Sequence, residues 1–297
     1  MVAPSQLCAA TALPASDLQS ISSNDRILVI APHPDDEAVC CGGTIAKARA
    51  AGAYVAIVWL TMGDAFEMNA YVLEKSFRPG PKGFRKLGAR RFKEAEAAGE
   101  VLGVPADALF LLGYPDRGLA ALLADHYEKP YQSPYTQMST VWYLSVLSPG
   151  ASYEGRNLER DLTAVLEKTR PTFVLAPSPA DAHSDHRAAG ELAIRALRRR
   201  GELNRARFWV VHAGSHWPEP RGLHIQKTLL PPTQLLGMGW QTVDLAREHR
   251  ELKLRALYAH ATQLEITPLF LTSFVRKNEL FARRPLPEKL PVSSPEP

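Results

Sequence analysis

The sequence predicts an α/β fold in which a doubly wound, mostly parallel, Rossmann-like sheet carries helices on both faces. Two observations predict it. From residue 26 onward, short continuous apolar runs alternate with segments whose apolar residues recur at helical spacing. Clusters of acidic residues and histidines also follow directly after two of the apolar runs. That placement is typical of parallel sheets, because their ligands bind beyond the carboxyl ends of the strands.

The elements follow in order from this alternation. The first apolar run, residues 26–32, is continuous, as in a strand that is buried on both faces. The helix expected after it ends at Gly52, a residue type that commonly ends helices. Strands are expected at residues 26–32, 54–61, 109–112, 172–176 and 207–213, and helices at residues 35–51, 90–102, 158–168, 186–199 and 243–263.

Residues 24–265 are expected to form one domain, with a loose tail at 1–23 and an extension at 266–297 that has a proline-rich end. Two stretches, 63–88 and 114–155, break the alternation and are expected to be loops near the ligand crevice. The second contains an insertion, residues 125–155, that is rich in tyrosine and tryptophan. The insertion has two interpretations: a lid that stacks on an extended substrate, or a surface insertion that packs its own aromatic residues.

Composition argues against several classes of protein. The net charge of the 297-residue chain is only +4, and its one basic cluster, at 195–207, surrounds a predicted helix end, so no nucleic-acid partner is expected. No run of about 18 apolar residues is present, so no membrane-spanning helix is expected. The N-terminal residues lack a signal-peptide pattern, which favours a cytoplasmic location, with export as the alternative that the loose N-terminus leaves open. The adjacent Cys40 and Cys41 are expected to be small core residues that do not bridge.

Two clusters with metal-binding chemistry follow the first and fourth predicted strands. They are Pro-His-Pro-Asp-Asp-Glu at 32–37 and His-Ser-Asp-His at 183–186. Because parallel strands deliver both clusters to one edge of the sheet, they are expected to meet there. Two neutral imidazoles and one carboxylate are a usual set for catalytic zinc, with positions left open for water and substrate, and the same set would hold Fe²⁺. Helix capping would need one acidic residue, and it explains neither His33 nor the doubled aspartate.

The paired clusters resemble the PIG-L/LmbE-like family of zinc-dependent N-acetylglucosaminyl deacetylases. The similarity spans residues 26–263, and it includes Arg-Phe-Lys-Glu at 91–94, Leu-Gly-Tyr-Pro-Asp at 112–116 and a closing helix with Lys253 and Gln263. The resemblance implies a metal-dependent hydrolase that removes an acetyl or other acyl group from the nitrogen of an N-acetylglucosamine-type sugar or its conjugate. Its cofactor would be Zn²⁺, with Fe²⁺ as the alternative, and its partner a small N-acyl amino sugar or glycoside.

The resemblance also assigns the reacting residues. The family's metal ligands correspond to His33, Asp36 and His186 in this sequence. Asp35 corresponds to the general base, which would take a proton as metal-bound water attacks the amide. Glu37 is expected to have a structural role.

Further residues are expected to act on the substrate. The resemblance implies that His183 stabilises the oxyanion and that Asp185 orients or polarises this histidine. A strong donor at this position would be protonated, and the nearby carboxylate of Asp185 would raise its pKa and favour that state. Arg91 and Asp116 correspond to positions that contact the sugar. His212, at the crevice end of the fifth predicted strand, is expected to be a further substrate contact or a lid hinge, with a fourth metal ligand as the alternative.

Three other functions share part of this pattern. A metal-dependent amidase acting on another small amide or on a thiol conjugate keeps the same site and changes the bond. An inactive sugar-binding protein would require loss of the base or of a ligand, and all of these residues are present. A nicotinamide-binding protein is excluded, because carboxylates stand where a pyrophosphate would need glycines.

Overall fold

Five adjacent parallel strands, β3 to β5 in the sheet order, form most of the sheet, as predicted. In the computed structural model, which describes residues 17–287, the strand order is β3-β2-β1-β4-β5-β7-β6. β1 pairs in parallel with both β2 and β4, so the chain leaves β1 and β4 toward opposite sides and opens a crevice between them. The strands are β1 (Arg26–Ala31), β2 (Tyr54–Thr61), β3 (Leu109–Tyr114), β4 (Phe173–Pro177), β5 (Ala206–Trp209), β6 (Trp240–Asp244) and β7 (Asn278–Ala282).

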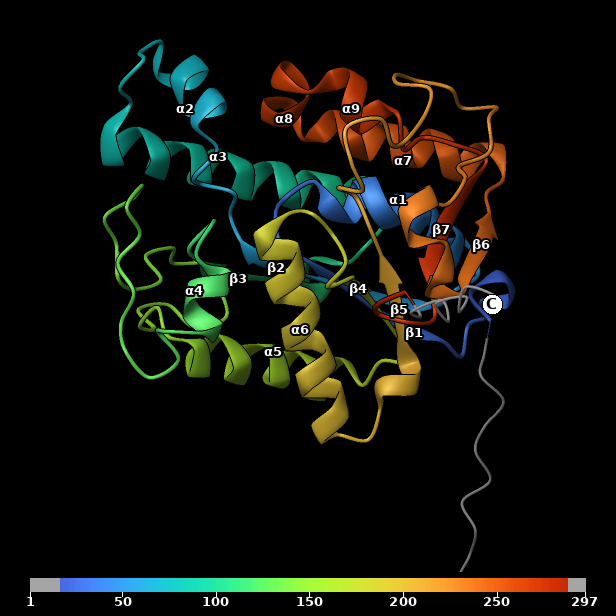
Figure 1. Ribbon diagram of the computed structural model, residues 1–297, viewed down its shortest axis with the longest axis horizontal. Coiled ribbons are helices and arrows are strands. Elements are labelled where there is room, and N and C mark those ends of the chain that lie inside the picture. The colour runs from blue at the N-terminus through green and yellow to red at the C-terminus, as the bar shows by residue number, and fades with distance from the viewer. Residues whose placement is uncertain (1–16, 288–297) are drawn as a thin grey trace, which may run out of the picture.

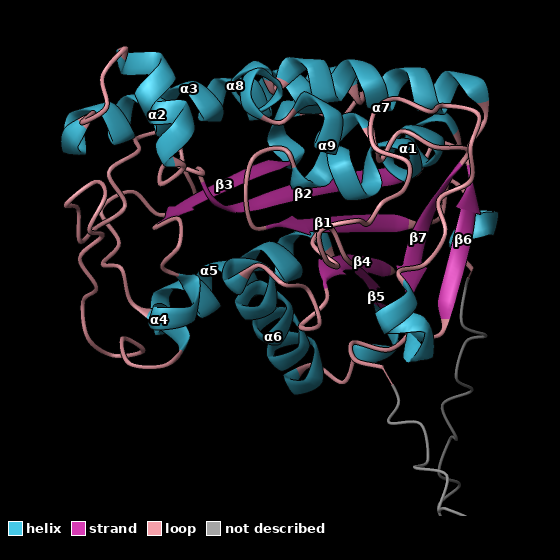
Figure 2. Cartoon of the chain, turned by 45° about the horizontal axis from the view of Figure 1, so that its top comes forward, coloured by secondary structure: helices cyan, strands magenta, loops and turns pink. Residues whose placement is uncertain are grey.

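Helices cover both faces of this sheet (Figure 1). Figure 2 shows α1, α3, α7, α8 and α9 along one face and α4, α5 and α6 along the other. On the first face α7 packs against α1 and α3, and on the second α6 packs against α4 and α5. The helices are α1 (Asp36–Ala50), α2 (Glu67–Glu74), α3 (Gly80–Val101), α4 (Leu119–Leu123), α5 (Gly155–Thr169), α6 (Ser184–Arg199), α7 (Arg247–Ala259), α8 (Ala261–Ile266) and α9 (Pro268–Thr272).

The stretch at 63–88 was expected to be a loop, but it contains α2 and the first turns of α3. Glycines at positions 80, 83 and 88 hide the helical pattern in this part of the sequence. At Gly88 a Cβ atom would overlap the hydroxyl group of Tyr143, which packs against the helix. This glycine therefore permits close packing inside a helix, a use that the sequence pattern does not distinguish from a turn.

The C-terminal part of the chain departs further from the prediction. The helix expected at 243–263 is α7, which follows β6 and is separated from α8 by a break at His260. Residues beyond 265, expected to be an extension, contribute α9 and β7, and β7 pairs antiparallel with β5 and β6 inside the sheet. The expected boundary at 265 therefore cuts through the fold. The prediction of a loose tail at 1–23 and of a proline-rich end falls largely outside the described residues, although Leu18 is buried.

A buried ion pair joins β7 to the helices above it. Nζ of Lys253 lies 2.6 Å from Oε1 of Glu279, and the backbone N–H groups of Gly43 and Thr44 donate to the same carboxylate at 2.8 Å. Both charged side chains are almost completely buried. A charged residue at the second position of a five-residue strand weakens the apolar pattern, which is why the sequence did not reveal β7.

The insertion at 125–155 packs part of its aromatic content into the fold. Tyr143 and Tyr153 are buried and belong to the main core. The hydroxyl group of Tyr143 donates to Oδ2 of Asp64 at 3.0 Å, and burial is the main cause that raises the pKa of Asp64 to about 7. Of the two interpretations of the insertion, these two tyrosines support the one in which it packs its own residues.

Cys40 and Cys41 lie in α1 within the core and are joined by a disulfide bond, contrary to the expectation that they would not bridge.

Among the helices of residues 17–287, none combines the length and the apolar composition that a bilayer-spanning segment needs.

Candidate active site

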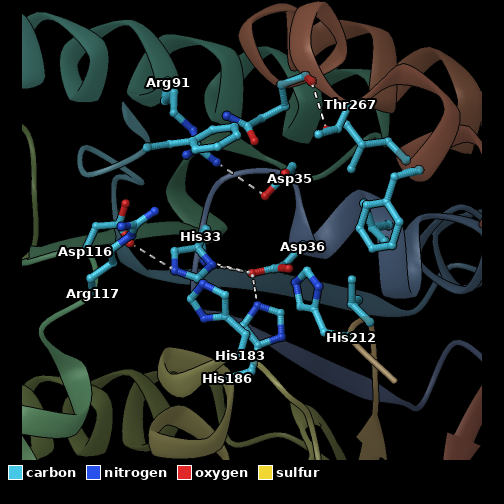
Figure 3. Close-up of a pocket in the computed structure, with 16 residues that line it drawn as sticks. His33, Asp35, Asp36, Arg91, Asp116, Arg117, His183, His186, His212 and Thr267 are labelled. Carbon is cyan, nitrogen blue, oxygen red and sulfur yellow. Dashed lines mark hydrogen bonds and ion pairs between the residues drawn. The ribbon is translucent and has the colours of Figure 1, made fainter. Parts of the chain in front are cut away.

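A pocket of about 270 Å³ lies beyond the carboxyl ends of β1 and β4, where the two predicted clusters meet. Figure 3 shows the residues that line it. Every residue predicted for the site lines this pocket except Asp185, which is completely buried beside it. The lining residues are His33, Asp35, Asp36, Val39, Phe66, Arg91, Asp116, Arg117, His183, His186, Val211, His212, Gln263, Thr267, Phe270 and Leu271.

One carboxylate oxygen, Oδ2 of Asp36, connects the two clusters. Nδ1 of His33 lies 3.2 Å from it and Nε2 of His186 lies 3.3 Å from it, as Figure 3 shows. The backbone N–H of His33 donates to the same oxygen at 2.9 Å. Burial raises the pKa of Asp36, but the charges of the two histidines outweigh burial and hold this pKa well below its usual range. Three potential ligand atoms from two loops therefore face one another.

Both of these histidines have a carboxylate at their other ring nitrogen. Nε2 of His33 lies 3.2 Å from Oδ1 of Asp116 and 3.3 Å from Oδ2 of Asp185. Nδ1 of His186 lies 3.3 Å from Oδ2 of Asp181. Burial lowers the pKa of both histidines, but the carboxylates outweigh it, raising the pKa of His33 well above its usual value and that of His186 to about 10. Histidines that bind metals usually have such partners, which fix the orientation of the ring.

Asp35 has a backbone conformation that aspartate rarely adopts, with φ at 127°. Its backbone N–H donates to Oε2 of Glu37 at 3.1 Å, and Nη2 of Arg91 lies 3.4 Å from its Oδ1. Burial raises the pKa of Asp35 to about 6, although the Arg91 charge acts in the opposite direction. Strained residues held by their surroundings are common at functional sites, and a carboxylate that titrates near neutral pH suits a general base.

Glu37 has the structural role that the sequence predicted. Its Oε2 also accepts a hydrogen bond from Nε1 of Trp59 at 2.8 Å. Its Oε1 lies 2.6 Å from Nε2 of His260. The break between α7 and α8 therefore places His260 next to Glu37, the residue whose carboxylate also accepts the backbone N–H of Asp35.

Asp185 does not face His183, contrary to the expectation. Its carboxylate lies against His33 and accepts hydrogen bonds from the backbone N–H groups of Arg117 at 2.7 Å and Leu119 at 3.2 Å. Nδ1 of His183 accepts from the backbone N–H of Asp185 at 3.2 Å, which leaves a neutral ring with its proton on Nε2. Burial, together with the charges of the neighbouring histidines, lowers the pKa of His183 to about 3. The structure therefore favours a neutral hydrogen-bond donor here, in place of the protonated one that was expected.

Arg91 and Asp116, predicted as sugar contacts, line the pocket but bond extensively to the protein. Arg91 donates from Nη1 to the carbonyl of Gly63 at 2.8 Å and from Nη2 to the carbonyl of Pro34 at 2.6 Å. Gly63 has a φ of 60°, and a Cβ atom here would overlap the guanidinium group, so a side chain at this position would be strained and would displace Arg91. Oδ2 of Asp116 accepts from the backbone N–H of Ala65 at 2.8 Å. Both side chains hold neighbouring loops in place.

His212 belongs to a more apolar side of the pocket. Its ring stacks on Phe270 with the ring centroids 5.5 Å apart, and its centroid lies 5.0 Å from that of His186. Burial and the His186 charge lower the pKa of His212 to about 4. Val211 and Leu271 line the same pocket. His212 thus presents a neutral ring to the pocket.

The donor groups of this site fit a bound metal ion. His33, His183 and His186 offer ring nitrogens that all lie within 4.8 Å of one another, and Oδ2 of Asp36 lies beside two of these rings. His33 and His186 have carboxylates behind them, and both are buried. Imidazole nitrogens and one carboxylate oxygen at such a site are donors typical of zinc or Fe²⁺.

Two residues at the site were not predicted to have a role. Asp181 accepts hydrogen bonds at Oδ2 from the backbone N–H groups of Val211 at 2.8 Å and His212 at 3.0 Å, so it ties together the loops after β4 and β5. Its position two residues before His183 was the only sequence signal for it. Arg117 lines the pocket, and a single basic residue in a loop gives no pattern to recognise.

Comparison with known proteins identifies relatives of this chain. A family model described as PIG-L, GlcNAc-PI de-N-acetylase, matches residues 28–197. The 1D-myo-inositol 2-acetamido-2-deoxy-alpha-D-glucopyranoside deacetylase of Saccharomonospora viridis is 29% identical over 261 residues, covering 82% of this chain and 86% of the relative. The probable N-acetyl-alpha-D-glucosaminyl L-malate deacetylase 2 of Bacillus anthracis is 27% identical over 244 residues, covering 81% and 82%.

A solved structure supports the same fold. A conserved protein from Thermus thermophilus matches with a TM-score of 0.53 and 25% identity, covering 91% of this chain and 99% of that one.

Proposed function

Because the chain belongs to the PIG-L family, whose model matches more than half of its residues, we propose that it is a metal-dependent N-deacetylase of amino sugars. Its substrate would be a glycoside or conjugate of N-acetylglucosamine type, from whose nitrogen it removes an acetyl or other acyl group. The observation that carries this proposal is the meeting of His33, Asp36 and His186 next to the strained Asp35.

His33, Asp36 and His186 would hold the metal ion, for which we propose zinc. Nδ1 of His33 lies 3.2 Å and Nε2 of His186 lies 3.3 Å from Oδ2 of Asp36, so the three atoms gather where the two loops meet. The carboxylates behind the two rings support this choice of ring nitrogens. Zinc supplies Lewis acidity at such a site, which makes a water molecule acidic enough to lose a proton near pH 7.

Asp35 would act as the general base. It is adjacent to Asp36 in sequence, and its own carboxylate points toward Arg91 and lines the pocket. With a pKa raised to about 6, the carboxylate is ionised at neutral pH and can still return the proton it has accepted to the leaving amine. Glu37 and Arg91 hold this residue from both ends, through its backbone N–H and its carboxylate.

His183 would stabilise the negative charge that develops on the carbonyl oxygen. Its Nδ1 is occupied by a backbone N–H, so the proton on Nε2 is available to donate. A neutral donor that is already oriented needs no charge to serve as part of an oxyanion site. The apolar side of the pocket, with His212 and Phe270, would take the acyl methyl group, and the side with Asp116 would take the sugar hydroxyls.

The experiment that tests this function combines metal content with amine release. The purified full chain would be analysed by mass spectrometry for bound metal and assayed on N-acetylglucosamine and on its inositol glycoside, before and after chelation. We expect about one zinc ion per chain and amine release that stops on chelation and returns with added zinc. Amine release that survives complete removal of metal, or no release from any N-acetylated sugar by the metal-loaded chain, would contradict the proposal.

A further inference from the structure

Arg117 lines the pocket but has no role in the reaction described above. Figure 3 shows it beside Asp116, on the opposite side of the pocket from His212. The other arginine in the lining, Arg91, is 3% exposed and is engaged by two carbonyl groups and by Asp35. Arg117 is exposed, and within the described part of the chain no carboxylate lies within 4.0 Å of its guanidinium nitrogens. Its positive charge therefore faces the pocket without a direct counterion.

The backbone of Arg117 is held in an unusual conformation. Its φ is 58°, in the left-handed region that costs energy for a residue with a side chain. Oδ2 of Asp185 accepts its backbone N–H at 2.7 Å, and Oδ1 accepts that of Leu119 at 3.2 Å. The same carboxylate lies 3.3 Å from Nε2 of His33. Arg117 is thus anchored to the group that orients a proposed metal ligand, which fixes its position relative to the reacting centre.

The insertion at 125–155 holds the side chain of Arg117 from the outside. Nη1 of Arg117 donates to the hydroxyl oxygen of Tyr135 at 3.0 Å, and the guanidinium carbon lies 5.5 Å from the centre of the same ring. Tyr135 in turn packs edge to face on Phe84 of α3, with ring centroids 5.3 Å apart. Arg85 of α3 also donates to the carbonyl of Thr136 at 2.7 Å. The insertion therefore reaches the pocket indirectly, through an arginine that it holds in place.

We propose that Arg117, held by Tyr135, forms an anion-binding subsite that recognises a carboxylate or phosphate on the group linked to the amino sugar. This inference rests on the proposed deacetylase function and concerns the substrate of the same site. A guanidinium group pairs with two oxygens of a carboxylate or phosphate at once, which a neutral hydroxyl group does not match. The nearby acidic groups are Asp116, whose oxygens already bond to His33 and Ala65, and Glu67. The two relatives named above differ in whether the group linked to the sugar carries a carboxylate, because one is named for an inositol glycoside and the other for a malate glycoside.

The test compares acidic and neutral substrates on matched variants of the zinc-loaded full chain. The substrates are N-acetylglucosaminyl malate, N-acetylglucosamine 1-phosphate and the neutral methyl glycoside of N-acetylglucosamine, so that the first two separate a carboxylate from a phosphate. Arg117→Gln removes the charge and keeps most of the length of the side chain. Arg198→Gln removes the same charge from an exposed position in α6 that does not line the pocket, and it serves as the control.

We expect kcat/KM of Arg117→Gln to fall about 10-fold to 100-fold on at least one acidic substrate, the range for loss of a hydrogen bond to a charged group. The neutral substrate is expected to change by less than about 3-fold, as are all three substrates with Arg198→Gln. Tyr135→Phe keeps the ring and removes the acceptor, so it should lower kcat/KM on the same acidic substrate by a smaller factor. If Arg117→Gln does not fold, as judged by its thermal unfolding, Tyr135→Phe provides the comparison.

The outcomes separate this inference from the proposed function. Equal losses on acidic and neutral substrates, or no loss on either acidic substrate, contradict the subsite while leaving the deacetylase function intact. Wild-type protein that releases amine from the neutral glycoside and not from either acidic one also contradicts the subsite. Absence of amine release from all three substrates contradicts the proposed function, and the inference that rests on it.

Discussion

The four histidines of the pocket form two pairs that differ in what stands behind their rings. His33 and His186 are buried, yet nearby carboxylates raise the pKa of both. His183 and His212 are only half-buried, yet the pKa of each is lowered, to about 3 and about 4. Burial alone would produce the reverse order, because it penalises the charged form of a histidine.

The comparison shows that the two pairs of histidines differ in whether carboxylates bond to their rings, and we propose that this difference separates metal ligands from the other histidines. Asp36 faces one nitrogen of each ring in the first pair, and further carboxylates face the other nitrogens. Such rings are held in a fixed orientation, as metal ligands need to be, and each would lose its extra proton when the metal binds. Rings that bond to no carboxylate among the described residues remain neutral and can donate a hydrogen bond or pack against a substrate. The predictions below test this division.

The largest expected effect comes from removing a ring of the first pair. His33→Ala and His186→Ala should each reduce bound zinc to background and abolish amine release, because each removes one of three proposed protein ligands. His212→Ala, from the second pair, should retain about one zinc ion per chain. Mass spectrometry of the three purified variants decides between these outcomes. Zinc retained at full occupancy by His33→Ala would exclude that residue from the ligand set.

Asp35→Asn should separate metal binding from turnover. The substitution keeps the size of the side chain and removes the base, so zinc content should remain unchanged while kcat falls about 10²-fold to 10⁴-fold. The measurement is single-turnover amine release by the zinc-loaded variant. If zinc content falls together with kcat, Asp35 binds the metal and is not a separate base.

Asp181→Asn tests the carboxylate behind His186. Loss of such a partner weakens metal affinity about 10-fold to 100-fold. Zinc titration against a competing chelator should detect this change, whereas kcat at saturating zinc should stay close to that of the wild type. Unchanged affinity would mean that Asp181 serves only to tie the loops after β4 and β5 through the N–H groups of Val211 and His212.

The sequence was sufficient to predict the centre of the sheet and the meeting of the two clusters. Both depend on local pattern, since a continuous apolar strand followed directly by polar residues places those residues at one sheet edge whatever follows later in the chain. The pattern around β1 and β4 is of this kind, and both clusters lie where it predicts.

The partner of Asp185 could not be predicted in this way. Its closeness to His183 in sequence pointed to a contact between the two side chains, but His183 caps the start of α6 and takes only the backbone N–H of Asp185. The carboxylate turns instead toward His33, which is 152 positions away in the chain. β7 was missed for a related reason, because Glu279 is compensated by Lys253 from a distant helix. Long-range compensation of a buried charge leaves no periodic signal.

The pH dependence of turnover should report the state of Asp35. Burial raises its pKa from an ordinary carboxylate value to about 6, and a base must be ionised to accept a proton. kcat/KM should therefore fall by about tenfold per pH unit below pH 6 and level off above it. The zinc content of each sample must be measured alongside, because protonation of His33 or His186 would also reduce activity by releasing metal. A profile that is flat between pH 5 and pH 7 at constant zinc content would remove Asp35 from the role of base.

The smallest effect is expected at His212, because neither metal binding nor a step of the reaction is assigned to this ring. Its backbone N–H, and not its ring, bonds to Asp181, and the ring stacks on Phe270. His212→Asn should therefore leave zinc content and the pH profile unchanged, and it should raise KM by only about 2-fold to 10-fold through lost packing against the substrate. Steady-state kinetics at saturating zinc measure this change. A loss of zinc in this variant would place His212 with the metal ligands, because Asp181, His186 and His212 also bring potential ligand atoms within 4.8 Å of one another. The carboxylates would then no longer account for the division between the two pairs of histidines.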